Sequence, residues 1–295
     1  MTEEIITKEY IKTVFPKREQ NSHKGTFGNV LNIAGSINYR GAAYLSTKSA
    51  LKVGAGYVEL ASIKEVVDSV STLCPEAVFI PLAQKNGTIV AEEYKKISKI
   101  LPKIKVLLFG CGISSIEKNQ EEIEQFVRTL LLNSEFSEKP VIIDADGINI
   151  ISRLKIEKLP FKTILTPHPA ELSRLLEIDV SDIRKDRIKY AEIAAKKYKS
   201  VIVLKGQNTV ITDGEKVFIN KTGNSALAKA GTGDVLAGMI AGFCSQGTDF
   251  LNAAILGVYL HGLAGEIASE KMSEYSVNAS ELIDFIPDAI LKILH

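Results

Sequence analysis

The sequence predicts an α/β fold of three layers, in which a mostly parallel central sheet is covered by helices on both faces. Short runs of β-branched and other apolar residues alternate with segments of helical periodicity over most of the chain. Several of these runs are apolar at every position, which is typical of parallel strands buried on both faces. A chain of 295 residues is also long enough to bury about three quarters of its unfolded surface.

The order of these segments predicts the elements one by one. Helical spacing lies between the strands, at residues 42–53, 120–132 and 183–197. Two β-rich runs around an Asp-Gly turn at 210–219 predict a C-terminal β-hairpin, and helices follow at 235–243, 252–266 and 281–294. With no linker or internal repeat, we expect residues 1–295 to form one domain. The predicted strands are 30–34, 57–61, 78–81, 106–109, 141–144, 163–166 and 201–204.

Composition excludes several classes of partner. The 36 basic and 35 acidic residues nearly cancel, so the chain lacks the surplus charge of a protein that binds nucleic acid or an anionic membrane. Cys74, Cys111 and Cys244 are widely spaced, which argues against a disulfide framework or structural zinc and predicts a cytoplasmic protein. The uncharged stretch 235–248 is too short and too rich in glycine to cross a bilayer. We therefore expect small-molecule partners.

The most informative motif is Ala230-Gly231-Thr232-Gly233-Asp234, which an apolar helix follows at once. Glycines let a ligand approach the backbone, and the first amides and the dipole of a helix favour an anion. A carboxylate at such a phosphate site repels the ligand unless it has a chemical role. We interpret Asp234 as the base that removes a proton during phosphoryl transfer. The structural alternative is a helix cap.

Further polar clusters follow the predicted strands, where ligands bind in open α/β sheets. Asp144 and Asp146 are interpreted either as helix caps or as metal ligands. His168, between two prolines, favours a ligand contact, whereas Glu171 fits either a helix N-terminus or a water of magnesium. Lys205 fits either a solvated sheet edge or a phosphate contact. The clusters are Gly35-Ser36 with Gly41-Ala42-Ala43, Gly110-Cys111-Gly112, Asp144-Ala145-Asp146-Gly147, Thr166 to Glu171, and Lys205 to Thr209.

One segment before the first buried strand has two interpretations. Residues 23–28 combine His23 and Lys24 with flexible glycines. The segment is either a mobile flap over the site or an ordinary entry loop.

Taken in order, these clusters resemble the ADP- or ATP-dependent NAD(P)H-hydrate dehydratases of the ribokinase-like superfamily. The resemblance covers nearly the whole chain, with two departures: the family usually has proline where Cys111 stands and glycine where Ala170 stands. The motifs that carry it are residues 23–28, 34–36 with 41–43, 110–112, 144–146, 166–171, 203–206, 222–224 and 230–234.

The resemblance implies a carbon–oxygen lyase that repairs the S epimer of hydrated NADH or NADPH. The nucleotide would phosphorylate the ring hydroxyl, and phosphate would then leave as the ring nitrogen donates electrons. ADP is the expected co-substrate, with ATP left open, together with Mg²⁺. The resemblance gives Asp234 as the catalytic base and Glu171 as an indirect magnesium contact. It implies substrate contacts at Ala43, Gly112, His168 and Asp234, and nucleotide contacts at Lys205, Gly206, Gln207, Asn208, Thr209, Gly231, Thr232 and Gly233.

Family likeness also implies a homo-oligomer, with a tetramer as the favoured form. Because no epimerase domain precedes the dehydratase motifs, we expect action on one epimer only, with the other supplied by a separate enzyme or by spontaneous interconversion. Two alternatives stay open. One is a ribokinase-like kinase for a vitamin precursor or sugar, and the other is a nucleotide-binding regulator without turnover.

Overall fold

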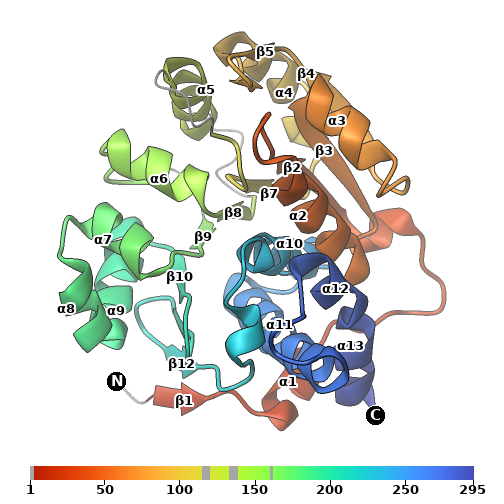
Figure 1. The fold of residues 1–295 in the computed structure, drawn as a ribbon, viewed down its shortest axis with the longest axis vertical. Helices are drawn as coiled ribbons and strands as arrows, with labels where there is room; N and C mark the ends of the chain where they lie inside the picture. The colour runs from red at the N-terminus through yellow and green to blue at the C-terminus, as the bar shows by residue number, and fades with distance from the viewer. Residues whose placement is uncertain (1–2, 115–119, 133–138, 160–161) are drawn as a thin grey trace.

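A ten-stranded sheet forms the centre of the computed structural model, which describes residues 3–114, 120–132, 139–159 and 162–295 (Figure 1). Its strand order is β1-β12-β11-β10-β9-β8-β7-β2-β3-β4, and helices cover both faces, which confirms the predicted layered α/β fold. The strands are β1 Glu3–Ile5, β2 Asn29–Ile33, β3 Tyr57–Ile63, β4 Val78–Leu82, β7 Val106–Phe109, β8 Val141–Ile143, β9 Thr163–Leu165, β10 Val201–Leu204, β11 Val210–Thr212 and β12 Val217–Ile219, with β5 Gln84–Lys85 and β6 Thr88–Ile89 paired separately.

Each pair of neighbouring strands in the part of the sheet β10-β9-β8-β7-β2-β3-β4 is parallel. Strands β7, β8 and β10 are continuous apolar runs and are buried at every position, as expected, and β2 is also buried throughout although it contains Asn29 and Asn32. The chain order changes direction between β2 and β7, because β3 and β4 lie on one side of β2 and the later strands on the other. A ligand crevice is expected at the carboxyl ends of these two strands.

The other end of the sheet is antiparallel. Strand β11 runs antiparallel to both β10 and β12, so residues 210–219 form the expected pair of strands. The pair is not C-terminal, because four helices follow it in the chain. Strand β1 was not predicted from the sequence: it adds to β12 in parallel, and three exposed residues are too few for a readable pattern.

Helices α2, α10 and α11 pack on one face of the sheet, whereas α5, α6, α7 and α9 lie on the opposite side (Figure 1). The helices are α1 Lys8–Val14, α2 Arg40–Lys52, α3 Lys64–Ser71, α4 Tyr94–Ser98, α5 Glu121–Leu131, α6 Asp146–Arg153, α7 Pro169–Leu176, α8 Val180–Lys185, α9 Arg187–Tyr198, α10 Thr232–Ser245, α11 Phe250–Met272, α12 Ala279–Asp284 and α13 Ile286–Leu294, with 3-10 turns η1 Lys24–Phe27, η2 Ala91–Glu93, η3 Leu101–Lys103 and η5 Ser225–Leu227.

Two predicted helices are each divided in the structure. The segment 183–197 contains the end of α8 and most of α9, because Asp186 leaves helical geometry and caps α9 by accepting the Lys189 amide N–H. The segment 281–294 is divided between α12 and α13, and Pro287 lies in the first turn of α13. Proline fits this position because its missing N–H has no helical partner there.

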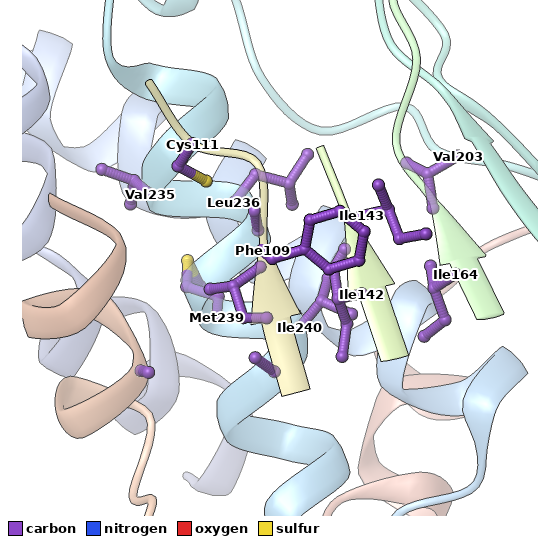
Figure 2. Packing of buried hydrophobic residues seen from close by; sticks show 14 of the residues in the cluster. Phe109, Cys111, Ile142, Ile143, Ile164, Val203, Val235, Leu236, Met239 and Ile240 are labelled. Atoms are coloured by element: carbon purple, nitrogen blue, oxygen red, sulfur yellow. The ribbon is translucent and has the colours of Figure 1, made fainter. Parts of the chain in front are cut away.

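Helix α10 is held tightly against the sheet and α2. Figure 2 shows Phe109, Ile142 and Ile143 of the sheet beside Leu236 and Ile240 of the helix. A Cβ on Gly238 would lie 2.1 Å from Ser49 Oγ of α2, so only glycine permits this approach. This packing fixes the N-terminus of α10 near the carboxyl ends of the parallel strands.

Helix α11 is a second apolar helix in the same layer. Its 23 residues are long and apolar enough to cross a membrane, which the stretch 235–248 is not. However, 72% of its most apolar window is buried inside the fold, against α10 and α13. Burial of this kind is typical of a core helix.

Candidate active site

The N-terminus of α10 has the geometry of an anion-binding site. Gly231 has φ 91° and turns the chain into the helix, a conformation that favours glycine. The helix has no side-chain cap, so Asp234 does not serve as one. Among the residues that the structure describes, no acceptor is found for the amide N–H groups of Gly233 and Asp234. These free amides are available to a phosphate.

A buried ion pair lies beside this helix start. Lys205, after β10, donates a hydrogen bond of 2.8 Å from Nζ to Oδ1 of Asp144, after β8. The Thr166 hydroxyl, after β9, donates to the same oxygen at 2.6 Å, and Asp144 is only 1% exposed. Nζ of Lys205 also lies 3.8 Å from Oε2 of Glu171. Three neighbouring strand ends therefore converge on one carboxylate.

Asp234 joins this cluster from the helix side. The Sγ atom of Cys111 and one carboxylate oxygen each of Asp144 and Asp234 lie within 4.8 Å of one another. Burial and the negative charge of Asp144 raise the pKa of Asp234 to about 7. Burial also raises the pKa of the Cys111 thiol, which therefore stays neutral. A carboxylate with a pKa near 7 is suited to act as a general base at neutral pH.

His168 and Glu171 form a capping box at the start of α7. His168 Nδ1 accepts the amide N–H groups of Ala170 and Glu171, and Glu171 Oε2 accepts the His168 amide at 2.7 Å. This is the structural alternative for Glu171, and it is observed. Burial nevertheless raises the pKa of Glu171 to about 7, and the residue borders the Lys205 pair. The His168 side chain is 47% exposed, and burial of the rest lowers its pKa.

A cavity of about 540 Å³ opens beside the cluster. Its walls include all of the loop 205–209 that joins β10 to β11, together with Thr232 and Gly233 of α10. Of the residues expected to bind nucleotide, Gly231 is absent from these walls, since a Cβ there would meet Leu45 and Ala279. The remaining wall is formed by Asn220 to Ser225, Leu227, Ala228, Leu236, Val258, His261 and Gly262.

None of the expected substrate contacts Ala43, Gly112, His168 and Asp234 belongs to the walls of that cavity. Ala43 of α2 is fully buried against the turn after β2, where a Cβ on Gly35 would lie 2.9 Å from its own Cβ. Gly112 has φ 62°, and a Cβ there would lie 2.6 Å from that of Tyr39. Both positions are at the β2–β7 switch point. Asp234 lies between the switch point and the cavity, because its carboxylate is within 4.8 Å of Sγ of Cys111 after β7 and its neighbour Gly233 belongs to the cavity wall.

The segment 23–28 lies far in space from the active-site groups of its own chain. It forms η1 before β2, and the Phe27 carbonyl accepts a hydrogen bond of 3.0 Å from Ser245, the last residue of α10. The site is at the opposite end of this 14-residue helix, a rise of about 20 Å. Residues 23–28 are therefore an ordinary entry loop to β2. The prediction that they form a flap over the active site of their own chain is wrong.

Sequence reasoning missed His261, which supports the site from α11. Its Nε2 lies 2.8 Å from the Thr232 carbonyl oxygen, and burial lowers its pKa to about 4. The ring is therefore neutral and donates its Nε2 proton to that carbonyl at the start of α10. A single histidine in an apolar helix was the available signal.

Comparison with known proteins identifies the family. A family model described as NAD(P)H-hydrate dehydratase matches residues 30–288. The chain belongs to this family. The NAD(P)H-hydrate dehydratase family thus accounts for the order of motifs from β2 to α13.

Two relatives show how the chain compares in length. The ADP-dependent (S)-NAD(P)H-hydrate dehydratase of Bacillus subtilis is 33% identical over 285 residues, 95% of each chain. A bifunctional NAD(P)H-hydrate repair enzyme of Thermofilum pendens is 36% identical, with 93% of this chain and 52% of the relative covered. The chain therefore spans about half the length of the bifunctional relatives.

Solved structures agree with the family. The B. subtilis ADP/ATP-dependent NAD(P)H-hydrate dehydratase, co-crystallised with ATP and Mg²⁺, has a TM-score of 0.82 and 31% identity, with 98% of each chain covered. Hydroxyethylthiazole kinase of Pyrococcus horikoshii has a TM-score of 0.56 at 15% identity, with 95% of this chain and 90% of the kinase covered, which shows the fold alone.

Proposed function

We propose that this dehydratase-family chain converts the S epimer of hydrated NADH or NADPH back to the reduced cofactor, using ADP. The observation that carries the proposal is the position of Asp234, between a cavity with free helix amides and the β2–β7 switch point. A B. subtilis relative is named as ADP-dependent, which supports ADP as a co-substrate, and the solved B. subtilis structure is named as ADP/ATP-dependent, so ATP is the second nucleotide to test.

The geometry fits a phosphorylation step. Asp234 removes the proton of the substrate hydroxyl as that oxygen attacks the terminal phosphoryl group of ADP, and the bond from that phosphorus to the bridging oxygen breaks to release AMP. Lys205 and the amides of Gly233 and Asp234 offset the charge on the phosphoryl oxygens. The carbon–oxygen bond then breaks as the ring nitrogen donates electrons, and a ring proton leaves. Phosphate carries away the hydroxyl oxygen, and the carbon–carbon double bond is restored.

The proposed contacts follow the two sides of Asp234. The loop 205–209, Thr232 and Gly233 hold the nucleotide in the cavity, with Gly231 shaping the turn behind them. Leu227, Leu236 and Val258 offer an apolar wall for its base. Ala43, Gly112 and His168 contact the hydrated dinucleotide.

The residues present fit a magnesium ion. Asp144, Glu171 and Asp234 gather three carboxylates around the single ammonium of Lys205, and Mg²⁺ binds carboxylates together with phosphate oxygens. Asp144 Oδ2 would hold the ion, whereas Glu171 would act through a water because its Oε2 already accepts the His168 amide. When bound, Mg²⁺ would neutralise phosphate charge.

The remaining proposals concern the setting of the reaction. We propose that residues 1–295 form one catalytic domain, which assembles into a homo-oligomer, with a tetramer as the expected form. It acts in the cytoplasm on hydrated cofactor, and a separate epimerase supplies the S epimer.

The deciding experiment supplies hydrated NADH with ADP, and then with ATP, and follows reduced-nicotinamide absorbance and inorganic phosphate. A dehydratase restores the absorbance and releases phosphate in equal amounts, faster with ADP. A phosphorylated product that accumulates without absorbance would instead indicate a small-molecule kinase. Nucleotide binding without any phosphate release would indicate a regulator.

A further inference from the structure

A single arginine outside the cavity holds the backbone of the loop 205–209. Arg187, at the start of α9, donates from Nη2 to the carbonyl oxygens of Leu204 at 2.8 Å and Lys205 at 3.2 Å. Its Nη1 donates to the carbonyls of Gln207 and Asn208, the latter at 3.2 Å. The four terminal N–H groups of a guanidinium thus match four carbonyl oxygens, that of Leu204 at the end of β10 and those of Lys205, Gln207 and Asn208 in the loop.

This arrangement determines where the amides of the loop point. In a trans peptide the N–H is directed opposite to the C=O. The amides of Gly206, Asn208 and Thr209 therefore point away from Arg187, and the described residues provide no acceptor for them. All three residues line the cavity, whereas Arg187 lines a separate groove on the outer side of the loop. The loop therefore directs its amides toward the cavity and its carbonyl oxygens toward Arg187 on the outer side.

The loop adopts a conformation that needs such support. Gly206 has φ 137° and Asn208 has φ 54°, which few L-residues adopt readily. A Cβ on Gly206 would lie 3.2 Å from Nη2 of Arg187, so glycine also allows the close approach. The guanidinium has no carboxylate partner among the described residues, and its charge faces the carbonyl dipoles of the loop instead. Both terminal nitrogens of Arg187 therefore bind backbone carbonyl oxygens of this segment.

We propose that Arg187 is a positioning residue that sets the affinity for ADP by aiming the amides of Gly206, Asn208 and Thr209 at the nucleotide. It touches neither the substrate nor the base Asp234. The inference rests on the proposed function, since it takes the cavity as the nucleotide site. Loss of Arg187 leaves the phosphoryl-transfer groups in place and lets the loop leave its binding conformation.

The test compares Arg187→Met and Arg187→Lys with the control Arg184→Met, which removes an exposed arginine three residues earlier. Calorimetry of the full chain with ADP gives Kd, kinetics give kcat and both KM values, and melting without nucleotide reports folding. We expect Kd and KM for ADP to rise about 10- to 100-fold in Arg187→Met, with kcat within about threefold. KM for hydrated NADH should stay near that of the control.

Arg187→Lys retains the charge but replaces the planar fork by one ammonium, so its Kd for ADP should fall between wild type and Arg187→Met. If Arg187→Met does not fold, the Kd of Arg187→Lys for ADP tests the inference in its place. An unchanged Kd for ADP in a folded variant, or an equal rise in both KM values, would overturn the inference. Wild type that binds ADP but restores no NADH would refute the proposed function alone, because the Kd comparison still stands.

Discussion

Lys205 and Asp144 form a largely buried ion pair, with 2.8 Å between Nζ and Oδ1, at the ends of β10 and β8, which lie on either side of β9. A Cβ on Gly233 would lie 3.4 Å from this ammonium and 3.9 Å from Asp144 Oδ2, so the pair lies directly beneath the start of α10. Asp144 therefore has two effects. It neutralises the lysine that faces the cavity, and its charge raises the pKa of the neighbouring Asp234.

The pH dependence of activity should follow from that coupling. Asp234 acts as a base only when ionised, so kcat/KM should rise with pH to a plateau above about 7. Asp144→Asn removes the repelling charge and should move the acid limb down by about 1 pH unit, while the plateau value of kcat/KM falls because Asp144 would also hold Mg²⁺. The pH profile of kcat/KM measures both. An acid limb that stays in place would show that Asp144 does not control the base.

Cys111 should have the opposite effect. Its thiol donates to Asp144 Oδ2 at 3.9 Å and lies within 4.8 Å of an Asp234 oxygen, where it lowers the pKa of Asp234 against the larger effect of burial. Cys111→Ala removes the donor, so the acid limb should move to higher pH, by less than Asp144→Asn moves it down. The same pH profile measures the shift, and Cys74→Ala, which alters a buried thiol outside this cluster, is the matched control. A shift of equal size in both variants would contradict this role of Cys111.

Asp234→Asn should separate chemistry from binding. Without the base, kcat should fall by about 10²- to 10⁴-fold. The affinity for ADP should change little, because the proposed nucleotide contacts are backbone amides and Lys205. Steady-state kinetics and calorimetry with ADP measure the two effects. Activity that survives within a few-fold would exclude Asp234 as the base.

The same substitution should stabilise the fold at high pH. The pKa of Asp234 is raised from 3.8 to about 7, so the folded chain holds a proton that the unfolded chain releases between these values. Stability from this group is complete below about pH 4 and is lost as the pH rises through 7. Asp234→Asn should therefore raise the free energy of unfolding by about 1–3 kcal/mol at pH 8 and by little at pH 4. Denaturant titrations at both pH values test this, with the exposed Asp284→Asn as control.

Two glycines in the same turn should respond differently to alanine. Gly231 has φ 91°, and its Cβ would lie 2.6 Å from Leu45 Cδ1, so Gly231→Ala should cost about 1–3 kcal/mol of stability. Gly233 is helical and faces the cavity, so Gly233→Ala should keep or slightly raise stability while weakening ADP binding about tenfold. Melting curves and ADP calorimetry distinguish the two. Equal loss of stability in both variants would contradict the difference.

Much of the fold was readable because the signals are local. The apolar runs at β7 and β10 predicted the first and last residues of both strands correctly, and the Asp-Gly turn predicted the pair β11–β12. Boundaries that depend on neighbours were not readable. The break at Asp186 requires knowledge of how its side chain caps α9, and β1 exists only because β12 offers it an edge.

The site was readable in part. The glycine turn before Asp234 and the lysine after β10 were identified by type and order, since glycine and a charged residue at a strand end carry local meaning. Arg187 and His261 were not, because an arginine in a helix turn and a histidine in an apolar helix are common in any fold. Their roles depend on backbone carbonyls 17 to 29 residues away in the chain.

By itself, the sequence determined the class of fold, the family and the residue types at the strand ends, because periodicity and motif order are properties of the chain alone. Only the tertiary structure decided that Asp144 rather than solvent partners Lys205, that Glu171 caps α7, and that residues 23–28 lie away from the site. The physical reason is that ion pairs, burial and pKa shifts depend on distances between segments, which parallel strand packing fixes and local sequence does not.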